Sequence, residues 1–330
     1  MKIICLTPVK NEEWILERFL KCASLWADHI IIADQNSIDR SVEIAKSFEK
    51  VTLINNDSKK FNEPNRQKML LEEARKISGE KLFIALDADE FLSSNILESP
   101  SLSLLKQQAV GTNIYIESLN IHPDFKQYWT KGFHYFGFVD DGSEHLGKEI
   151  DSPRLPISKN AVRFNVNDIK VLHFQYTDIE RAKYKQIWYQ CLEKTLHSPL
   201  TYLGTKKTNF YLFERYNKIR FTQHETLSIQ YDWTSLYSKI GINLFYKHES
   251  INHPHLLYIK ELFDEYGVFH FRKLNIWDID WNELFHSKNY SDPRDFATKI
   301  IHKWLTSRKR INLSKRELFY INLLEKAGLF

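Results

Sequence analysis

Long hydrophobic runs are missing from this 330-residue chain. No stretch approaches the roughly 18 uninterrupted apolar residues that a membrane-spanning helix needs. The few apolar residues that precede Pro8 are too short a run for a signal peptide. These absences predict a cytoplasmic protein.

Cysteine is also scarce. The chain has three, Cys5, Cys22 and Cys191, which stand far apart, each among apolar neighbours. None lies in a CxxC pair, so the spacing indicates neither a zinc site nor a redox motif. We expect three reduced thiols that pack as small core side chains.

An excess of charge of one sign is absent too. The 46 basic and 42 acidic residues leave a net charge of +4, which is too balanced to indicate nucleic-acid binding. With 43% hydrophobic and 14% aromatic residues, the composition is that of an ordinary globular protein. The chain is long enough to bury a large core, and it shows no internal repeat.

Short apolar runs alternate with helix-like patterns through the first part of the chain. The helical patterns begin at Asn11, near Val42 and at Asn65, and the last of them ends before Gly79. Strands and helices that alternate in this way predict an α/β fold, a mostly parallel sheet with helices on both faces. The predicted strands cover residues 2–7, 29–33, 51–54 and 81–86.

Polar side chains follow three of these strands. Asn11 and Glu12 come after the first, Asp34 after the second, and Asp87 and Asp89 after the fourth. Ligands of such sheets bind beyond the carboxyl ends of the strands. We therefore expect these side chains to converge at one edge of the sheet.

The acidic pair ends the buried run that begins at Phe83. Along an extended chain, Asp87 and Asp89 turn to the same side, about 7 Å apart and closer if the chain bends. Carboxylates spaced in this way suit Mg²⁺ or Mn²⁺, which bind through one or two carboxylates plus the phosphates of a substrate. The alternative is an acidic pair that merely caps a strand and faces solvent.

The pattern changes after residue 100. Two further strands are predicted over residues 113–119 and 169–176, and a helix begins at a capping box of Thr177 and Glu180. Beyond residue 225 aromatics, histidine and asparagine follow no clean period. We predict a nucleotide-binding and catalytic domain over residues 1–225 and a smaller, mainly helical extension over residues 226–330.

The order of motifs resembles a family 2 glycosyltransferase of the GT-A fold over about the first 200 residues. Two departures stand out: Gln35-Asn36-Ser37-Ile38-Asp39 replaces the usual Asp-Gly-Ser-Thr-Asp, and the acidic element that supplies the base has no clean match. The resemblance rests on Thr7-Pro8-Val9-Lys10-Asn11-Glu12-Glu13, Asp34 with Ser37-Ile38-Asp39, Asn65-Arg66, Leu86-Asp87-Ala88-Asp89-Glu90, and Val171-Leu172-His173-Phe174.

The resemblance implies a nucleotide-sugar donor and a divalent cation, Mn²⁺ or Mg²⁺. Asp87, Asp89 and His173 would hold the cation, and the imidazole favours Mn²⁺ on ligand type. A core histidine bonded to backbone is the alternative for His173. Asp34 would accept a hydrogen bond from the ring N–H of uracil, unless it is a cap or loop carboxylate, and Arg66 would pair with a phosphate or with Asp87. The implied donor-binding residues are Thr7, Pro8, Val9, Asn11, Glu12, Asp34, Arg66, Asp87 and Ala88.

Inverting transfer also needs a general base that takes the proton of the acceptor hydroxyl. The family places its base before the late histidine, where this chain has an acidic loop. Glu144 is the first candidate and Asp141 the second. Asp140 lies too close to both for the sequence to decide.

Residues 296–316 carry seven basic side chains and no acidic one. A basic amphipathic segment can dock on an anionic membrane surface, and the alternative is a solvated helix face packed on its own domain. Docking would place the protein peripherally on the inner face of the membrane and suggest a lipid-linked acceptor.

These observations predict an inverting, metal-dependent glycosyltransferase of cell-surface polysaccharide or lipopolysaccharide assembly. Its donor is predicted to be a UDP-sugar and its acceptor a hydroxyl of a glycan or lipid-linked glycan. A sugar nucleotidyltransferase is an alternative, but it would need a glycine-rich loop after the first strand, and residues 7–14 contain no glycine. An Asp-x-Asp phosphatase is another alternative, but such an enzyme usually begins with its acidic strand, and here three predicted strands precede it. A non-catalytic nucleotide-sugar-binding relative also stays open.

Overall fold

The computed structural model describes residues 1–58, 62–147, 152–158, 161–196, 226–246 and 253–307, together with 314–316, 319–320 and 323. The chain divides into two compact units. Unit 1 comprises Met1–Asp178 and Thr226–Glu249, and unit 2 comprises Ile179–Glu225 and Ser250–Phe330. The boundary predicted at residue 225 therefore differs from this division, since the chain leaves unit 1 earlier and returns to it.

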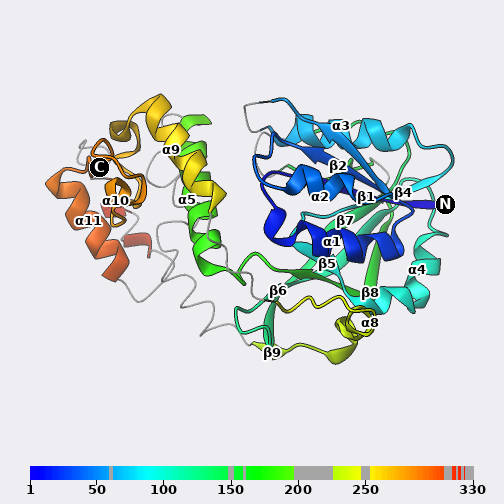
Figure 1. The fold of residues 1–330 in the computed structure, drawn as a ribbon. Coiled ribbons are helices and arrows are strands. Elements are labelled where there is room, and N and C mark those ends of the chain that lie inside the picture. The colour runs from blue at the N-terminus through cyan, green and yellow to red at the C-terminus, as the bar shows by residue number, and fades with distance from the viewer. Residues whose placement is uncertain are drawn as a thin grey trace. The chain divides into compact units, whose positions relative to one another are not determined.

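Unit 1 is built on one sheet, in which the described residues form nine strands (Figure 1). The strand order is β3-β2-β1-β4-β7-β6-β8-β5, with β9 beside β7. Strands β1 to β4 are mutually parallel, and β7 joins β4 in the antiparallel direction. The fold is thus the predicted α/β class. The strands are β1 Lys2–Val9, β2 His29–Asp34, β3 Val51–Asn55, β4 Lys81–Ala85, β5 Glu90–Leu92, β6 Asn113–Ile121, β7 Gln127–Val139, β8 Arg163–His173 and β9 Leu227–Ser228.

Helices cover both faces of the parallel half, because successive strand residues point to opposite sides. Cys5 and Ile30 pack in a core with Phe19 of α1 (Glu13–Trp26), whereas Ile4 and Leu70 of α3 (Glu63–Arg75) belong to another. Helix α2 (Ser41–Lys46) packs beside α1. The chain thus builds outward from β1 to β3 along one face and returns to β4 along the other. Such a reversal creates a switch point between β1 and β4, where sheets of this kind bind ligands.

A late segment of the chain also belongs to unit 1. Residues 226–246 pack on the sheet, since Trp233 contacts the ring of Tyr128 at 5.2 Å and the Tyr237 hydroxyl donates to the Leu92 carbonyl at 3.0 Å. Burial of these groups explains why this segment belongs to unit 1. The remaining elements are η1 Ser94–Leu97, α4 Pro100–Leu105, η3 Tyr231–Trp233 and α8 Ser235–Lys239.

The three cysteines are buried and free, as predicted. Burial raises the pKa of the Cys5 thiol to about 12, although a hydrogen bond with Thr7 acts in the opposite direction. Burial likewise raises the pKa values of Cys22 and Cys191. Thiols of this kind are inert packing groups.

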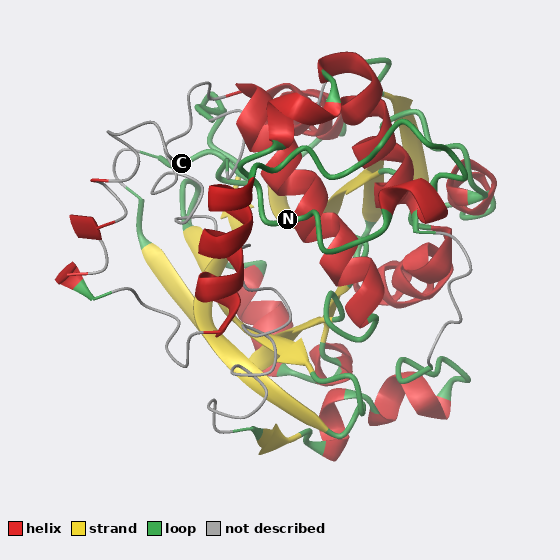
Figure 2. Cartoon of the chain, turned by 90° about the vertical axis from the view of Figure 1, so that its left-hand side faces the viewer, coloured by secondary structure: helices red, strands yellow, loops and turns green. Residues whose placement is uncertain are grey.

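Unit 2 is helical in its described part (Figure 2). Trp188 of α5 contacts Tyr258 of α9, with their ring centres 5.8 Å apart, and Phe263 stacks on Trp277 at 5.3 Å. Among the described residues, no helix is both long enough and apolar enough to cross a bilayer. The helices are α5 Ile179–Leu196, α9 Pro254–Tyr266, η4 Val268–Phe271, α10 Trp281–Leu284 and α11 Phe296–Ser307.

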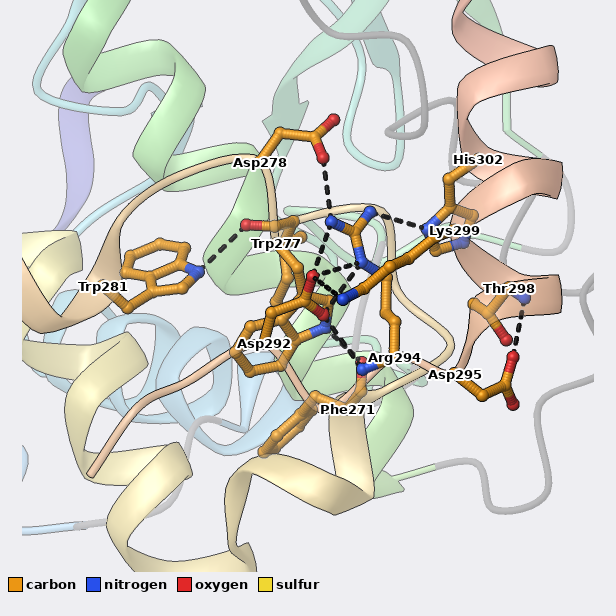
Figure 3. A network of polar contacts seen from close by, with 11 residues as sticks. Phe271, Trp277, Asp278, Trp281, Asp292, Arg294, Asp295, Thr298, Lys299 and His302 are labelled. Atoms are coloured by element: carbon orange, nitrogen blue, oxygen red, sulfur yellow. Dashed lines mark hydrogen bonds and ion pairs between the residues drawn. The ribbon is translucent and has the colours of Figure 1, made fainter. Parts of the chain in front are cut away.

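A buried arginine ties α11 to the preceding loop (Figure 3). The Arg294 side chain is 6% exposed, and its guanidinium donates to Asp278 at 2.9 Å and to Asp292 at 3.0 Å. Its Nη1 also lies 3.2 Å from Nδ1 of His302, which is fully buried on α11. Burial and the charge of Arg294 lower the pKa of His302 to about 4. His302 is therefore neutral at physiological pH.

Candidate functional site

The loops that follow β1 and β2 are joined to each other by hydrogen bonds. Val9 and Asp34 are register partners at the ends of these parallel strands. The Asn11 N–H donates to Ser37 Oγ at 2.8 Å, and the Ile38 N–H donates back to Asn11 Oδ1 at 2.7 Å. Asn11 itself has φ 55, a left-handed conformation that asparagine tolerates better than most residues. Asn11 thus shapes the loop through both backbone and side chain.

Asp34 keeps one carboxylate oxygen unused. Its Oδ2 accepts from the Ser37 N–H at 3.0 Å, whereas Oδ1 is buried and has no hydrogen-bond partner in the described structure. A buried acceptor without a partner is costly. An N–H donor of a bound ligand would satisfy this oxygen.

The acidic pair lies in a tight turn at the end of β4. The Glu90 N–H donates to the Asp87 carbonyl, and the Asp87 N–H donates to Glu90 Oε2, both at 2.9 Å. The Leu86 N–H bonds the Leu6 carbonyl of neighbouring β1 at 3.1 Å. The acidic motif therefore lies at the carboxyl edge of the sheet, next to the loops of Asn11 and Asp34, as predicted.

Asp89 and His173 face each other across the strand ends. His173 Nε2 lies 3.7 Å from Asp89 Oδ2, and both side chains are less than 10% exposed. The Phe174 N–H bonds the Asp89 carbonyl at 2.8 Å, and His173 is the register partner of Glu90. His173 Nδ1 has no hydrogen-bond partner in the described structure. This histidine is thus not a core residue satisfied by backbone.

Arg154, which belongs to none of the sequence motifs, lies beside the carboxylate of Asp87. Nη2 of Arg154 donates to Asp87 Oδ2 at 2.9 Å and to Glu90 Oε1 at 3.0 Å. Its Nη1 donates to Glu90 Oε2 and, at 3.3 Å, to the Ala85 carbonyl. Burial lowers the pKa of Arg154, but the charges of Asp87 and Glu90 outweigh it, so the pKa lies above its ordinary value.

Asp89 and His173 are the residues that could hold a divalent cation, with the remaining ligands supplied by a substrate. Within the described ranges, no group of three or more His, Cys, Asp or Glu side chains is arranged to hold a metal. Mg²⁺ and Mn²⁺ are commonly bound by one or two carboxylates plus substrate phosphates. The three carboxylates of the turn and the guanidinium of Arg154 leave two negative charges, which one such cation would balance.

The other predicted donor-binding residues flank this edge. Thr7, Val9 and Ala88 are buried, and Pro8 is the register partner of Ala33, one residue before the last pair of β1 with β2. The Glu12 carboxylate accepts from Trp14 Nε1 at 2.6 Å. Arg66 lies half-buried in the first turn of α3.

Two of the three predicted base residues, Asp140 and Asp141, are not brought to this edge. The Asp140 N–H bonds the carbonyl of Lys81, the first residue of β4, and its carboxylate pairs with Arg75 at 2.8 Å. β4 rises about 3.3 Å per residue, so its ends lie roughly 13 Å apart. Asp140 and its neighbour Asp141 therefore lie at the opposite edge of the sheet from Asp87.

Hydrogen bonds also hold the acidic loop that contains Asp141 and Glu144. Burial raises the pKa of Asp141, but hydrogen bonds from Ser143 and Ser158 outweigh it and lower the pKa below its ordinary value. The Ser143 carbonyl accepts from Arg75 at 2.8 Å, and the next residue, Glu144, is exposed. The first part of the loop, through Ser143, is thus held at the C-terminal end of α3.

Arg154 was missed because nothing in its sequence neighbourhood has a period. It stands in Ser152-Pro153-Arg154-Leu155-Pro156, a run that reads as a loop. The available signal was a cation flanked by prolines in a segment following an acidic loop. Only the tertiary structure brings it to Asp87.

One family model matches the first part of the chain. Residues 4–151 match the model of glycosyl transferase family 2. The match includes β1 to β4, the loop of Asp34 and the acidic turn. Among curated proteins no sequence match is found.

Parts of several solved structures are similar to this chain at low identity. Glucosyl-3-phosphoglycerate synthase from Mycobacterium tuberculosis is 17% identical, with a TM-score of 0.26 over 36% of this chain and 44% of that one. HddC from Yersinia pseudotuberculosis is 12% identical, with a TM-score of 0.31 over 52% and 93%. A nucleotidyl transferase from Methanothermobacter is 9% identical, with a TM-score of 0.29 over 45% and 77%. None of these likenesses bears on substrate or mechanism.

Proposed function

We propose that the protein is an inverting glycosyltransferase that moves a sugar from a nucleoside diphosphate to a hydroxyl of a glycan or lipid-linked acceptor in cell-surface polysaccharide assembly. The observation that carries the proposal is the pair of Asp89 and His173, 3.7 Å apart at the sheet edge that also holds Asp34. A divalent cation bound there would act as a Lewis acid toward the departing diphosphate. Asp87 is the third ligand predicted from the sequence.

The free oxygen of Asp34 supports a uracil-containing donor. Uracil presents a ring N–H to an acceptor such as Asp34 Oδ1, whereas cytosine presents a lone pair at the same ring position. A buried site built to receive a donor rejects an analogue that lacks it, because its own polar group is left unpaired. UDP is therefore expected to bind more tightly than CDP.

Isothermal titration calorimetry with UDP and CDP, with and without Mn²⁺, tests the proposal. We expect Mn²⁺-dependent binding of UDP that exceeds binding of CDP by tenfold or more, since one buried hydrogen bond to a charged group is worth about 1.5–3 kcal/mol. Asp34→Asn should reduce this preference, and Glu98→Gln, which removes an exposed carboxylate elsewhere, should keep it. Absence of binding by any nucleoside diphosphate would contradict the proposed function.

The general base stays a prediction from the sequence, with Glu144 first and Asp141 second. Because Asp141 lies at the opposite edge of the sheet and its pKa is lowered, we expect Asp141→Asn to leave turnover within about twofold of the parent enzyme. If Glu144 is the base, Glu144→Gln should lower turnover by about 10²–10⁴-fold, which is the usual contribution of a general base. Turnover with the sugar nucleotide identified by calorimetry, under saturating donor, measures both variants.

Membrane contact through residues 296–316 is also a proposal. On α11, Phe296 is 80% and Ile300 51% exposed, while Thr298 and His302 are buried. One face of the helix therefore packs on unit 2 and another is open. Residues 308–313 lie outside the described part, so the basic cluster there is known from sequence alone.

A further inference from the structure

Arg154 is held in place by its neighbours before any ligand binds. Leu155 is fully buried in the core between α3 and the sheet. The Ser152 N–H donates to Glu63 at 2.8 Å, and the Tyr135 hydroxyl donates to the Pro156 carbonyl. The guanidinium lies over the ring of Phe136, 5.3 Å from its centre. The backbone on both sides of Arg154 is thus anchored.

The guanidinium keeps one donor for a ligand. Four of its five N–H groups are used by Asp87, Glu90 and the Ala85 carbonyl. Nε–H has no partner in the described structure, and the side chain remains 26% exposed. Asp87 beside it is 39% exposed. A small anion can therefore reach this side of the acidic turn.

We propose that Arg154 binds the diphosphate of the donor and stabilises it as a leaving group, with Asp87 as the residue that positions the guanidinium. The proposal rests on the proposed function. In the transfer, the bond between the sugar carbon and the diphosphate oxygen breaks, and its electron pair stays on that oxygen. The acceptor oxygen forms the new bond to the sugar carbon and loses its proton to a base. A fixed cation near the departing oxygen stabilises the charge that develops there.

This assignment gives the two aspartates of the motif different tasks. Asp89 points to His173, on the side where a cation would be held, and Asp87 points to Arg154. The guanidinium is permanently charged and its planar donors match phosphate oxygens. Charge neutralisation of the diphosphate would then not depend on the metal alone.

Calorimetry on the 330-residue chain with UDP, UMP and inorganic pyrophosphate, in the presence of Mn²⁺, tests the assignment. We expect Arg154→Ala to weaken UDP and pyrophosphate by about 10–100-fold, the loss expected for a charge-assisted hydrogen bond, and UMP by less than threefold. Arg154→Lys, which keeps the charge, should fall between. The matched control is Arg163→Ala, which removes an arginine that also lies over an aromatic ring but at the far end of β8 from His173.

The outcomes separate this inference from the proposed function. UDP binding that is equal in the parent protein and in Arg154→Ala would overturn the role of Arg154 and leave the proposed function intact. A structural role alone would weaken UDP and UMP alike, which the comparison of the two nucleotides detects. Pyrophosphate binding without UDP binding in the parent protein would overturn the uracil assignment and keep Arg154. Binding of neither would overturn both.

Discussion

Asp89→Asn is expected to cause a large loss of metal-dependent turnover. The amide has nearly the shape of the carboxylate but no charge, so the pair with His173 loses its anionic member. Lewis-acid stabilisation by a bound cation is worth several kcal/mol, and we expect a fall in kcat/KM of roughly 10²–10³-fold. Steady-state kinetics over a series of Mn²⁺ concentrations measures it.

A control variant and a measurement of Mn²⁺ binding make this result specific. Glu98→Gln removes an exposed carboxylate away from the acidic turn and should keep the parent rate. Mn²⁺ binding followed by electron paramagnetic resonance should weaken in Asp89→Asn and in His173→Ala. Unchanged Mn²⁺ affinity in both variants would contradict the assignment of this pair as metal ligands.

The stability of unit 2 is expected to fall steeply in mild acid. The pKa of His302 is about 4 in the folded chain and about 6.5 when unfolded. Protons therefore bind the unfolded chain first, so the contribution of His302 is complete above pH 6.5 and is lost progressively as the pH falls toward 4. The full loss is about 3 kcal/mol. Urea unfolding at pH 7, 6, 5 and 4, followed by tryptophan fluorescence, measures it.

The neighbours of His302 make this expectation specific to one histidine. Arg294 lies against its ring and lowers the pKa, whereas the Lys273 backbone, Asp278 and Asp292 act in the opposite direction. His302→Gln should flatten the dependence on pH between 6.5 and 4. His286→Asn, at an exposed position with φ 49 that asparagine tolerates, should keep it. Parallel pH curves for the parent protein and His302→Gln would rule out this origin.

The parallel half of the sheet was predictable because its signals are local. Buried strands such as residues 29–33 are continuous apolar runs, and helix α1 shows its period in Phe19 and Trp26. The convergence of Asp34 with Asp87 then followed from topology, because the ends of parallel strands meet at one edge. The proximity of Asp89 to His173, which the resemblance implied, could not be obtained from local periodicity.

The positions of Asp140, Arg154 and residues 226–246 depend on long-range pairing, which leaves little signal in the local sequence. The chain order of β4, β7 and β6 says nothing of direction, and the antiparallel pairing of β7 with β4 is what carries Asp140 to the far edge. The return of residues 226–246 to unit 1 depends on contacts such as Tyr237 with Leu92. Arg154 reaches the acidic turn for the same reason, through a buried Leu155 that no sequence period marks.

The reciprocal hydrogen bonds of the acidic turn have a thermodynamic consequence. Glu90 fixes the backbone of Asp87 from both ends of the turn, and it does so with a side chain that is 3% exposed. The turn is therefore already ordered in the folded protein, and binding need not order these residues. A site organised in this way should take up its ligand rapidly, with an association rate limited by encounter and not by rearrangement of the turn.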